Sequence, residues 1–141
     1  MSSVKTDIIT VLDTKPVVYP SSAQFGGILR VQRGQYEASA LASGSDITVA
    51  RLPKGSVVHG FHIQHDALGS AVTLALGVAG ATTRYLAATA AASAGHLGHE
   101  TDGAIGGIGV ELTAETDIII TTGGASATGT IEATIFYACP A

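Results

Sequence analysis

Short apolar runs set the strongest constraint on how this 141-residue chain can fold. After residue 27, runs rich in Val, Ile, Leu and Thr recur, and a glycine or a proline follows each of them within a few residues. A regular helix needs about ten or more residues without such breaks, whereas strands of roughly four to eight residues tolerate them. The sequence therefore predicts an all-β protein that forms an antiparallel sandwich or barrel.

We expect strands where β-branched and aromatic residues gather between turn signals. Their predicted ranges are 28–32, 46–52, 56–65, 71–78, 105–111, 116–122 and 129–138. Residues 82–95 differ, because they are rich in alanine, lack alternation and end in glycine. This pattern favours one short helix around 83–94, with an irregular excursion as the alternative.

Alternation of apolar and polar residues within the expected strands predicts which side chains face the core. The predicted core residues are Ile47, Val49, Phe61, Ile63, Val72, Leu74, Leu76, Ile118, Ile120, Ile131, Ile135 and Tyr137.

The first 25 residues have a different character from the rest of the chain. Two apolar bursts are separated by Pro16 and closed by Pro20, and proline is a poor residue for a central strand. We predict an extended N-terminal arm at 1–25 and a single sandwich domain at 26–141. The arm could lie as an edge strand on its own domain or reach a neighbouring subunit. Its expected partner-binding residues are Val4, Ile8, Ile9, Val11, Leu12, Val17, Val18 and Tyr19.

All five histidines fall into two clusters, His59, His62 and His65 in one and His96 and His99 in the other. On a strand, the first and third of these would share one face and lie about 20 Å apart, while the second would point away. Zinc needs three or four ligands at ~2.0–2.3 Å from one point. A single strand cannot supply them, and nothing in the sequence brings the second cluster to the first. We therefore expect no metal and no cofactor.

Composition and motifs argue against several function classes. The net charge is −4 and the seven basic residues are scattered, unlike the basic patch of a nucleic-acid-binding protein. Cys139 is the only cysteine, so no internal disulfide or cysteine-based zinc site is expected. No apolar run is long enough for a membrane span and no signal peptide is evident, which predicts folding in a cytoplasm. The glycine-rich runs 106–109 and 122–129 lack the spacing and the lysine of nucleotide-binding loops. We expect no enzyme.

The order of motifs over residues 51–138 resembles a known family. It begins with the Leu52-Pro53-Lys54-Gly55 turn and continues through a strand ending in "LALGV". It then runs through "ELTAETDIII" and a hairpin rich in Gly, Ala, Ser and Thr to a last strand that carries Tyr137. These features resemble the small structural proteins of tailed-phage virions, in particular head decoration (cement) proteins, which are jelly-roll-like β-sandwiches.

The resemblance implies a non-enzymatic protein on the outer surface of a virion, where it would stabilise the shell by bridging capsomers. The implied partners are the major capsid protein and further copies of the chain in a homotrimer, assembled in the host cytoplasm, with no nucleic acid and no membrane. The alternatives are another virion component, such as a tail or head-completion protein, a carbohydrate-binding module, and a cupin-like metal protein. The family has no catalytic residues to assign to this sequence.

Overall fold

The computed structural model describes residues 28–99 and 107–139. The elements of these residues are all β-strands, and there is no helix among them long and apolar enough to cross a membrane. The strands are β1 (Leu29–Leu41), β2 (Asp46–Leu52), β3 (Val57–His65), β4 (Thr73–Val78), β5 (Ala81–Ala90), β6 (Gly95–Gly98), β7 (Thr116–Gly123) and β8 (Ala127–Ala138).

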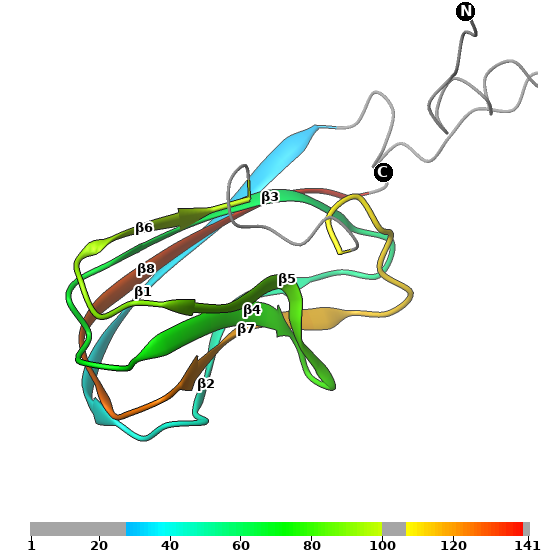
Figure 1. The fold of residues 1–141 in the computed structure, drawn as a ribbon. Helices are drawn as coiled ribbons and strands as arrows, with labels where there is room; N and C mark the ends of the chain where they lie inside the picture. Colours follow the sequence, from blue (N-terminus) through cyan, green and yellow to red (C-terminus); the bar gives the residue numbers. More distant parts are fainter. Residues whose placement is uncertain (1–27, 100–106, 140–141) are drawn as a thin grey trace, which may run out of the picture.

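The strands form two four-stranded sheets that face each other (Figure 1). One sheet has the order β1-β8-β3-β6 and the other has the order β2-β7-β4-β5. Every pairing between neighbouring strands is antiparallel. Successive strands therefore alternate between the sheets over much of the chain, which is the connectivity of a jelly roll. The predicted fold class, an antiparallel jelly-roll-like sandwich, is confirmed.

The core lies between the two sheets and contains the side chains that strand alternation predicted. All of the predicted core residues are buried except Ile47 and Val49, which are partly buried and pack against the core. The core also includes side chains that alternation did not predict. Among the largest are Leu52, Leu68, Tyr85 and Leu86, each no more than 1% exposed.

The predicted helix around 83–94 is wrong. Most of this segment is strand β5, and Gly95–Gly98 form the short strand β6. The register of β5 against β4 shifts near Leu76, and the adjacent residues Tyr85 and Leu86 are both buried. The pairing with β4 and this burial outweigh the helical preference of alanine. The predicted strand at 105–111 is also wrong in its described part, where residues 107–109 form a turn and Glu111 makes one isolated bridge to Val57.

Two glycines in tight turns show how backbone approach limits the sequence. Gly124 has a φ of +81° and lies against the carbonyl oxygen of Ala71, so that an added Cβ would overlap this oxygen. Gly44 has almost the same φ, +83°, but an added Cβ there would have nothing within 4 Å. The two positions therefore separate the cost of a left-handed backbone from the cost of a steric clash.

Gly124→Ala is expected to destabilise the fold by about 3 kcal/mol or more, and Gly44→Ala by only about 1–2 kcal/mol, because only the first adds a clash to the backbone strain. Chemical denaturation of both variants measures the difference. Equal losses of unfolding free energy would show that the close approach of Gly124 to Ala71 contributes nothing.

Candidate functional site

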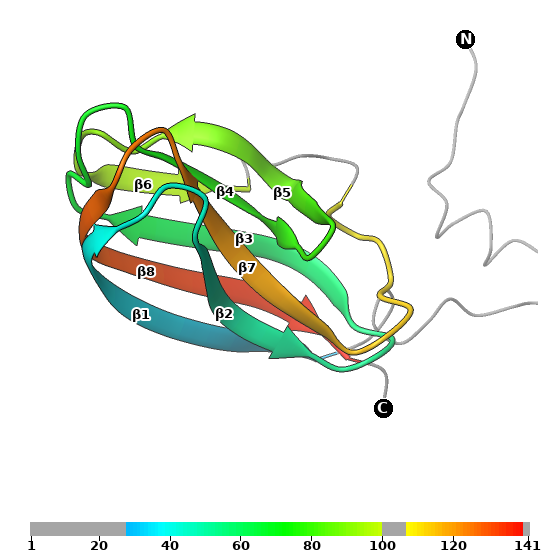
Figure 2. The same ribbon diagram turned by 90° about the horizontal axis from the view of Figure 1, so that it is seen from below.

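The candidate site is the side of the sandwich where β1 and β2 meet. Each is an edge strand of its own sheet, and the two lie next to each other (Figure 2). β1 also carries most of the large exposed apolar side chains of the described residues: Leu29 is 58% exposed, Val31 53% and Tyr36 41%. A long edge strand with exposed apolar residues is a typical site for pairing with another chain.

The hydrogen bonds of β8 show which backbone groups of β1 face this open edge. The N–H of Thr130 donates to Asp66 Oδ2 at 3.1 Å, and Thr130 accepts from the N–H of Asp66 at 3.0 Å. The N–H and C=O groups of Thr130 thus point toward the β3 side. Those of the next residue, Ile131, point toward its β1 partner Tyr36. By alternation, every second residue of β1 presents its N–H and C=O groups to the open edge. These residues are Leu29, Val31, Arg33, Gln35 and Glu37.

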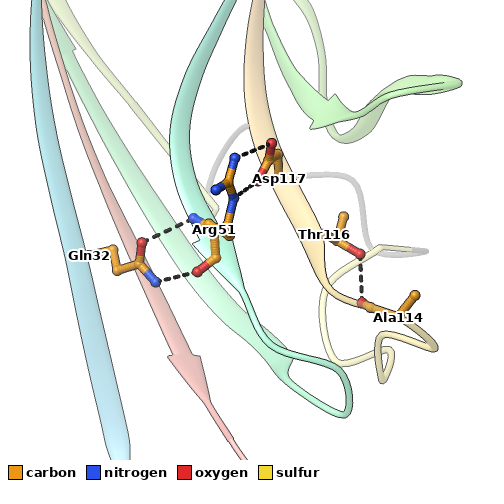
Figure 3. Close-up of polar contacts among 5 residues, drawn as sticks. All are labelled: Gln32, Arg51, Ala114, Thr116 and Asp117. Atoms are coloured by element: carbon orange, nitrogen blue, oxygen red, sulfur yellow. Dashed lines mark hydrogen bonds and ion pairs between the residues drawn. The ribbon is translucent and has the colours of Figure 1, made fainter.

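A side-chain amide joins the two edge strands at one end of this site (Figure 3). Gln32 Nε2 donates to the carbonyl oxygen of Arg51 at 2.8 Å, and the N–H of Arg51 donates to Gln32 Oε1 at 3.0 Å. The same Nε2 lies 3.1 Å from the hydroxyl of Tyr137. The amide thereby binds both backbone groups of Arg51 as a neighbouring strand would, and it closes the sandwich between β1 and β2.

The side chain of Arg51 extends this contact to β7. Its Nε lies 2.6 Å from Asp117 Oδ1 and a terminal nitrogen lies 3.1 Å from Oδ2, so the ion pair is bidentate (Figure 3). The hydrogen bond from Arg51, together with its positive charge, lowers the pKa of Asp117 below its ordinary value. The hydrogen bond to Asp117 likewise raises the pKa of Arg51. Both side chains are exposed to solvent, so the pair orients Arg51 more than it stabilises the fold.

Beyond the Gln32 amide, the sandwich is hollowed between β1 and β2. The hollow has a volume of about 110 Å³, enough for an aliphatic side chain, and its walls are largely apolar. It is lined by Gly34, Gln35, Tyr36, Ile47, Thr48, Val49 and Ile131. The site therefore combines unpaired backbone groups along one strand with an apolar hollow directly beside them.

The two histidine clusters meet because β6 pairs with β3. In this pairing His96 lies opposite Gln64 and Gly98 lies opposite His62. The rings of His62 and His96 consequently stack, with centroids 5.6 Å apart and an angle of 24° between their planes. This contact could not be predicted from the sequence, because β6 has only four residues and no alternation of its own.

The other histidines contact the backbone around β3. The N–H of Phe61 donates to His99 Nδ1 at 3.1 Å, and the ring lies so close to Gly60 that an added Cβ would overlap it. His65 is buried, with Nδ1 2.9 Å from the carbonyl oxygen of Asp66. Strict alternation would place His59 on the same face as the buried residue Phe61, but His59 is exposed, because the strand bulges between Val58 and Gly60.

Over the part of the chain that the structure describes, no three side chains of the His, Cys, Asp or Glu type are arranged to hold a metal ion. His62 and His96 contact each other, His65 contacts a backbone group, and His99 contacts the backbone and the ring of Phe61. Their geometry therefore stabilises the β3–β6 pairing, and the expected absence of a metal and of a cofactor stays a prediction.

The predicted partner-binding residues lie outside the described residues. They are Val4, Ile8, Ile9, Val11, Leu12, Val17, Val18 and Tyr19. The β1 edge was not predicted as a site, because only 28–32 was expected to be a strand there. The alternation in "VQRGQYEA" is weak, although its polar and charged residues are typical of an edge strand.

Solved structures with the same fold come from phage capsids. A chain in the capsid asymmetric unit of cyanophage Pam1 superposes with a TM-score of 0.66 and 29% identity, over 82% of this chain and 88% of that one. This chain resembles phage capsid proteins. Two further capsid chains share the fold. The chain from Ralstonia phage GP4 has a TM-score of 0.65 and 18% identity, over 82% of this chain and 86% of that one. The chain from Helicobacter pylori bacteriophage KHP30 has a TM-score of 0.60 and 13% identity, over 81% of this chain and 90% of that one.

No family model and no curated protein matches the sequence. The expected resemblance to structural proteins of phage virions is confirmed by the capsid chains, and it supports a structural role in a virion.

Gln32→Leu is expected to lower the unfolding free energy by about 1–3 kcal/mol, because both backbone groups of Arg51 lose their partner. Gln35→Leu is a matched control, since the Gln35 side chain makes no such contact and should change stability by less than about 0.5 kcal/mol. Urea denaturation of both variants tests the expectation. A loss at Gln35 as large as that at Gln32 would contradict it.

The Arg51–Asp117 pair predicts a pH effect on stability. Because the folded protein lowers the pKa of Asp117, the pair stabilises the fold above the ordinary aspartate pKa of about 4, and this contribution is lost as the pH falls through the lowered value. Asp117→Asn should remove this part of the acid-induced loss, and Arg51→Gln should remove it equally. Thermal melts between pH 7 and pH 3 compare the three proteins; parallel curves would refute the coupling.

Proposed function

We propose that the chain is a non-enzymatic decoration (cement) protein, which binds the outer surface of a phage capsid and stabilises the shell by bridging capsomers. The observation that supports this proposal most strongly is the similarity to a chain of the cyanophage Pam1 capsid, at 29% identity over most of both chains. Since the match covers 88% of that chain, that capsid component is itself a small protein made largely of this sandwich.

A decoration protein needs a stable body and an adhesive surface. The body here is the sandwich, whose buried core and short turns suit a protein that must persist as a static surface. The adhesive surface has two parts: the arm at 1–25 with its eight predicted partner-binding residues, and the open edge of β1. The major capsid protein and other copies of this chain are the partners, and a homotrimer would match the local three-fold positions of an icosahedral shell.

The apolar content of the arm is sufficient for tight binding. At ~25 cal/mol per Å², the burial of about 400 Å² of apolar surface contributes on the order of 10 kcal/mol before the cost of ordering the arm is subtracted. Extended segments of this type also gain backbone hydrogen bonds when they bind along a strand edge. The arm would therefore supply attachment, while the sandwich supplies the body that spans neighbouring capsomers.

Deleting residues 1–22 is expected to leave the sandwich folded, with a thermal transition close to that of the full chain, and to reduce binding to capsids by at least tenfold. Co-sedimentation with capsids lacking the protein measures binding, and circular dichroism measures the fold. Normal capsid binding by the shortened chain, or its failure to fold, would refute the role of the arm. Rings formed by the full chain, seen by electron microscopy, would favour a tail or head-completion protein instead.

A further inference from the structure

We propose that the open edge of β1 is a receptor for the N-terminal arm of a second copy of this chain, with residues 6–12 added to the sheet as a further strand. This inference rests on the proposed function, because it assigns the arm a docking place within the oligomer. Its basis is the combination of three features: the unpaired backbone groups of β1, the hollow beside them, and the length of the chain that precedes β1.

The edge is open over enough of its length to hold a strand of seven residues. β1 has 13 residues, and Leu29 to Glu37 present alternate N–H and C=O groups on the side away from β8. No strand among residues 28–99 and 107–139 pairs with this side. Of the devices that usually protect an edge, β1 has the charged side chains of Arg30, Arg33 and Glu37, but it contains neither proline nor lysine and its register shift comes only after Ala38.

The hollow between β1 and β2 indicates an apolar guest. A strand laid beside β1 points every second side chain toward the interior of the sandwich. There it would meet Tyr36, Ile47 and Val49, which line the hollow and are all incompletely buried. The segment Thr6–Leu12, "TDIITVL", has β-branched or apolar residues at six of its seven positions and contains no proline. It is the part of the arm best suited to a strand.

The length of the intervening chain favours a neighbouring copy over the chain's own edge. Residues 13–27 separate this segment from β1 and include Pro16 and Pro20, which favour extended backbone. At ~3.1 Å per residue, fifteen extended residues reach about 45 Å. This is about the length of β1 itself, roughly 43 Å at ~3.3 Å per residue. A spacer extended in this way would be long enough to bring the segment to the next subunit.

Cross-linking between differently labelled chains tests the proposal. In a Cys139→Ser background, one chain carries Ile9→Cys in the arm and another carries Gln35→Cys on the edge. The two purified full-length chains are mixed, alone and with capsids, and treated with a short bismaleimide. We expect a covalent dimer that contains one chain of each kind. Ala88→Cys, exposed on β5 at the opposite edge of the other sheet, is the control and should give at least tenfold less product.

A second pair of variants tests the backbone pairing. In the chain that carries Gln35→Cys, Val31→Pro removes an N–H that faces the open edge, so it should leave the thermal transition nearly unchanged and lower the yield of the cross-link at least tenfold. Tyr36→Pro removes an N–H that faces β8 and should destabilise the fold itself. A third chain carries both Ile9→Cys and Gln35→Cys. Cross-linking within this chain without any product between the two single-cysteine chains, or no arm-to-edge product in either condition, would overturn the proposal. Capsid binding by the unmodified chain, measured in parallel, shows whether the proposed function fails with it.

Discussion

Burial of side chains from β7 and β8 in the core between the sheets is the interaction on which the rest of the structure depends. These strands follow one another in the sequence but lie in opposite sheets, and each is paired on both of its sides. Ile118 and Ile120 on β7, with Ile131 and Ile135 on β8, are almost completely buried between the sheets. The four remaining neighbours, β1, β3, β2 and β4, are placed by hydrogen bonding to these two strands. The edge strands β2 and β5 add Leu52, Tyr85 and Leu86 to the core that these central strands organise.

Alternation predicted the central strands well, because burial on one face imposes a period of two on the sequence. It failed at β5 and β6, where alanine and glycine dominate and the pairing partner alone determines the conformation. It also failed at His59, because a β-bulge shifts the face of every residue that precedes it and leaves no mark in composition. The contact between His62 and His96 could not be predicted either, because it depends on the pairing of β3 with β6, and β6 was not predicted.

The candidate site at the edges of β1 and β2 was not predicted from the sequence. An apolar arm stands out in any sequence, and the partner-binding role of its eight named residues stays a prediction, because they lie outside the described residues. The edge that would receive it does not stand out, because an edge strand is defined by the absence of a neighbour. Gln32 illustrates this difficulty: its amide binds the backbone of Arg51, although in the sequence it is one glutamine among the polar residues of a strand. Only the arrangement of the two sheets shows that these residues form one surface.

The register of β1 against β8 fixes when this protein can fold during synthesis. Leu29 lies opposite Ala138, so the first described strand finds its partner only when the last one has left the ribosome. The same strand β8 also separates β1 from β3, and no described strand can replace it. Until β8 has been synthesised, β1 has unpaired backbone groups on both sides. The pairing of β1 with β8 also closes a loop of most of the chain, which makes folding slow compared with that of helical proteins. The chain is thus most prone to aggregate while it is still being translated. A ribosome that stalls just before residue 127 would release a product that has every strand of the β2-β7-β4-β5 sheet but lacks the partner of β1.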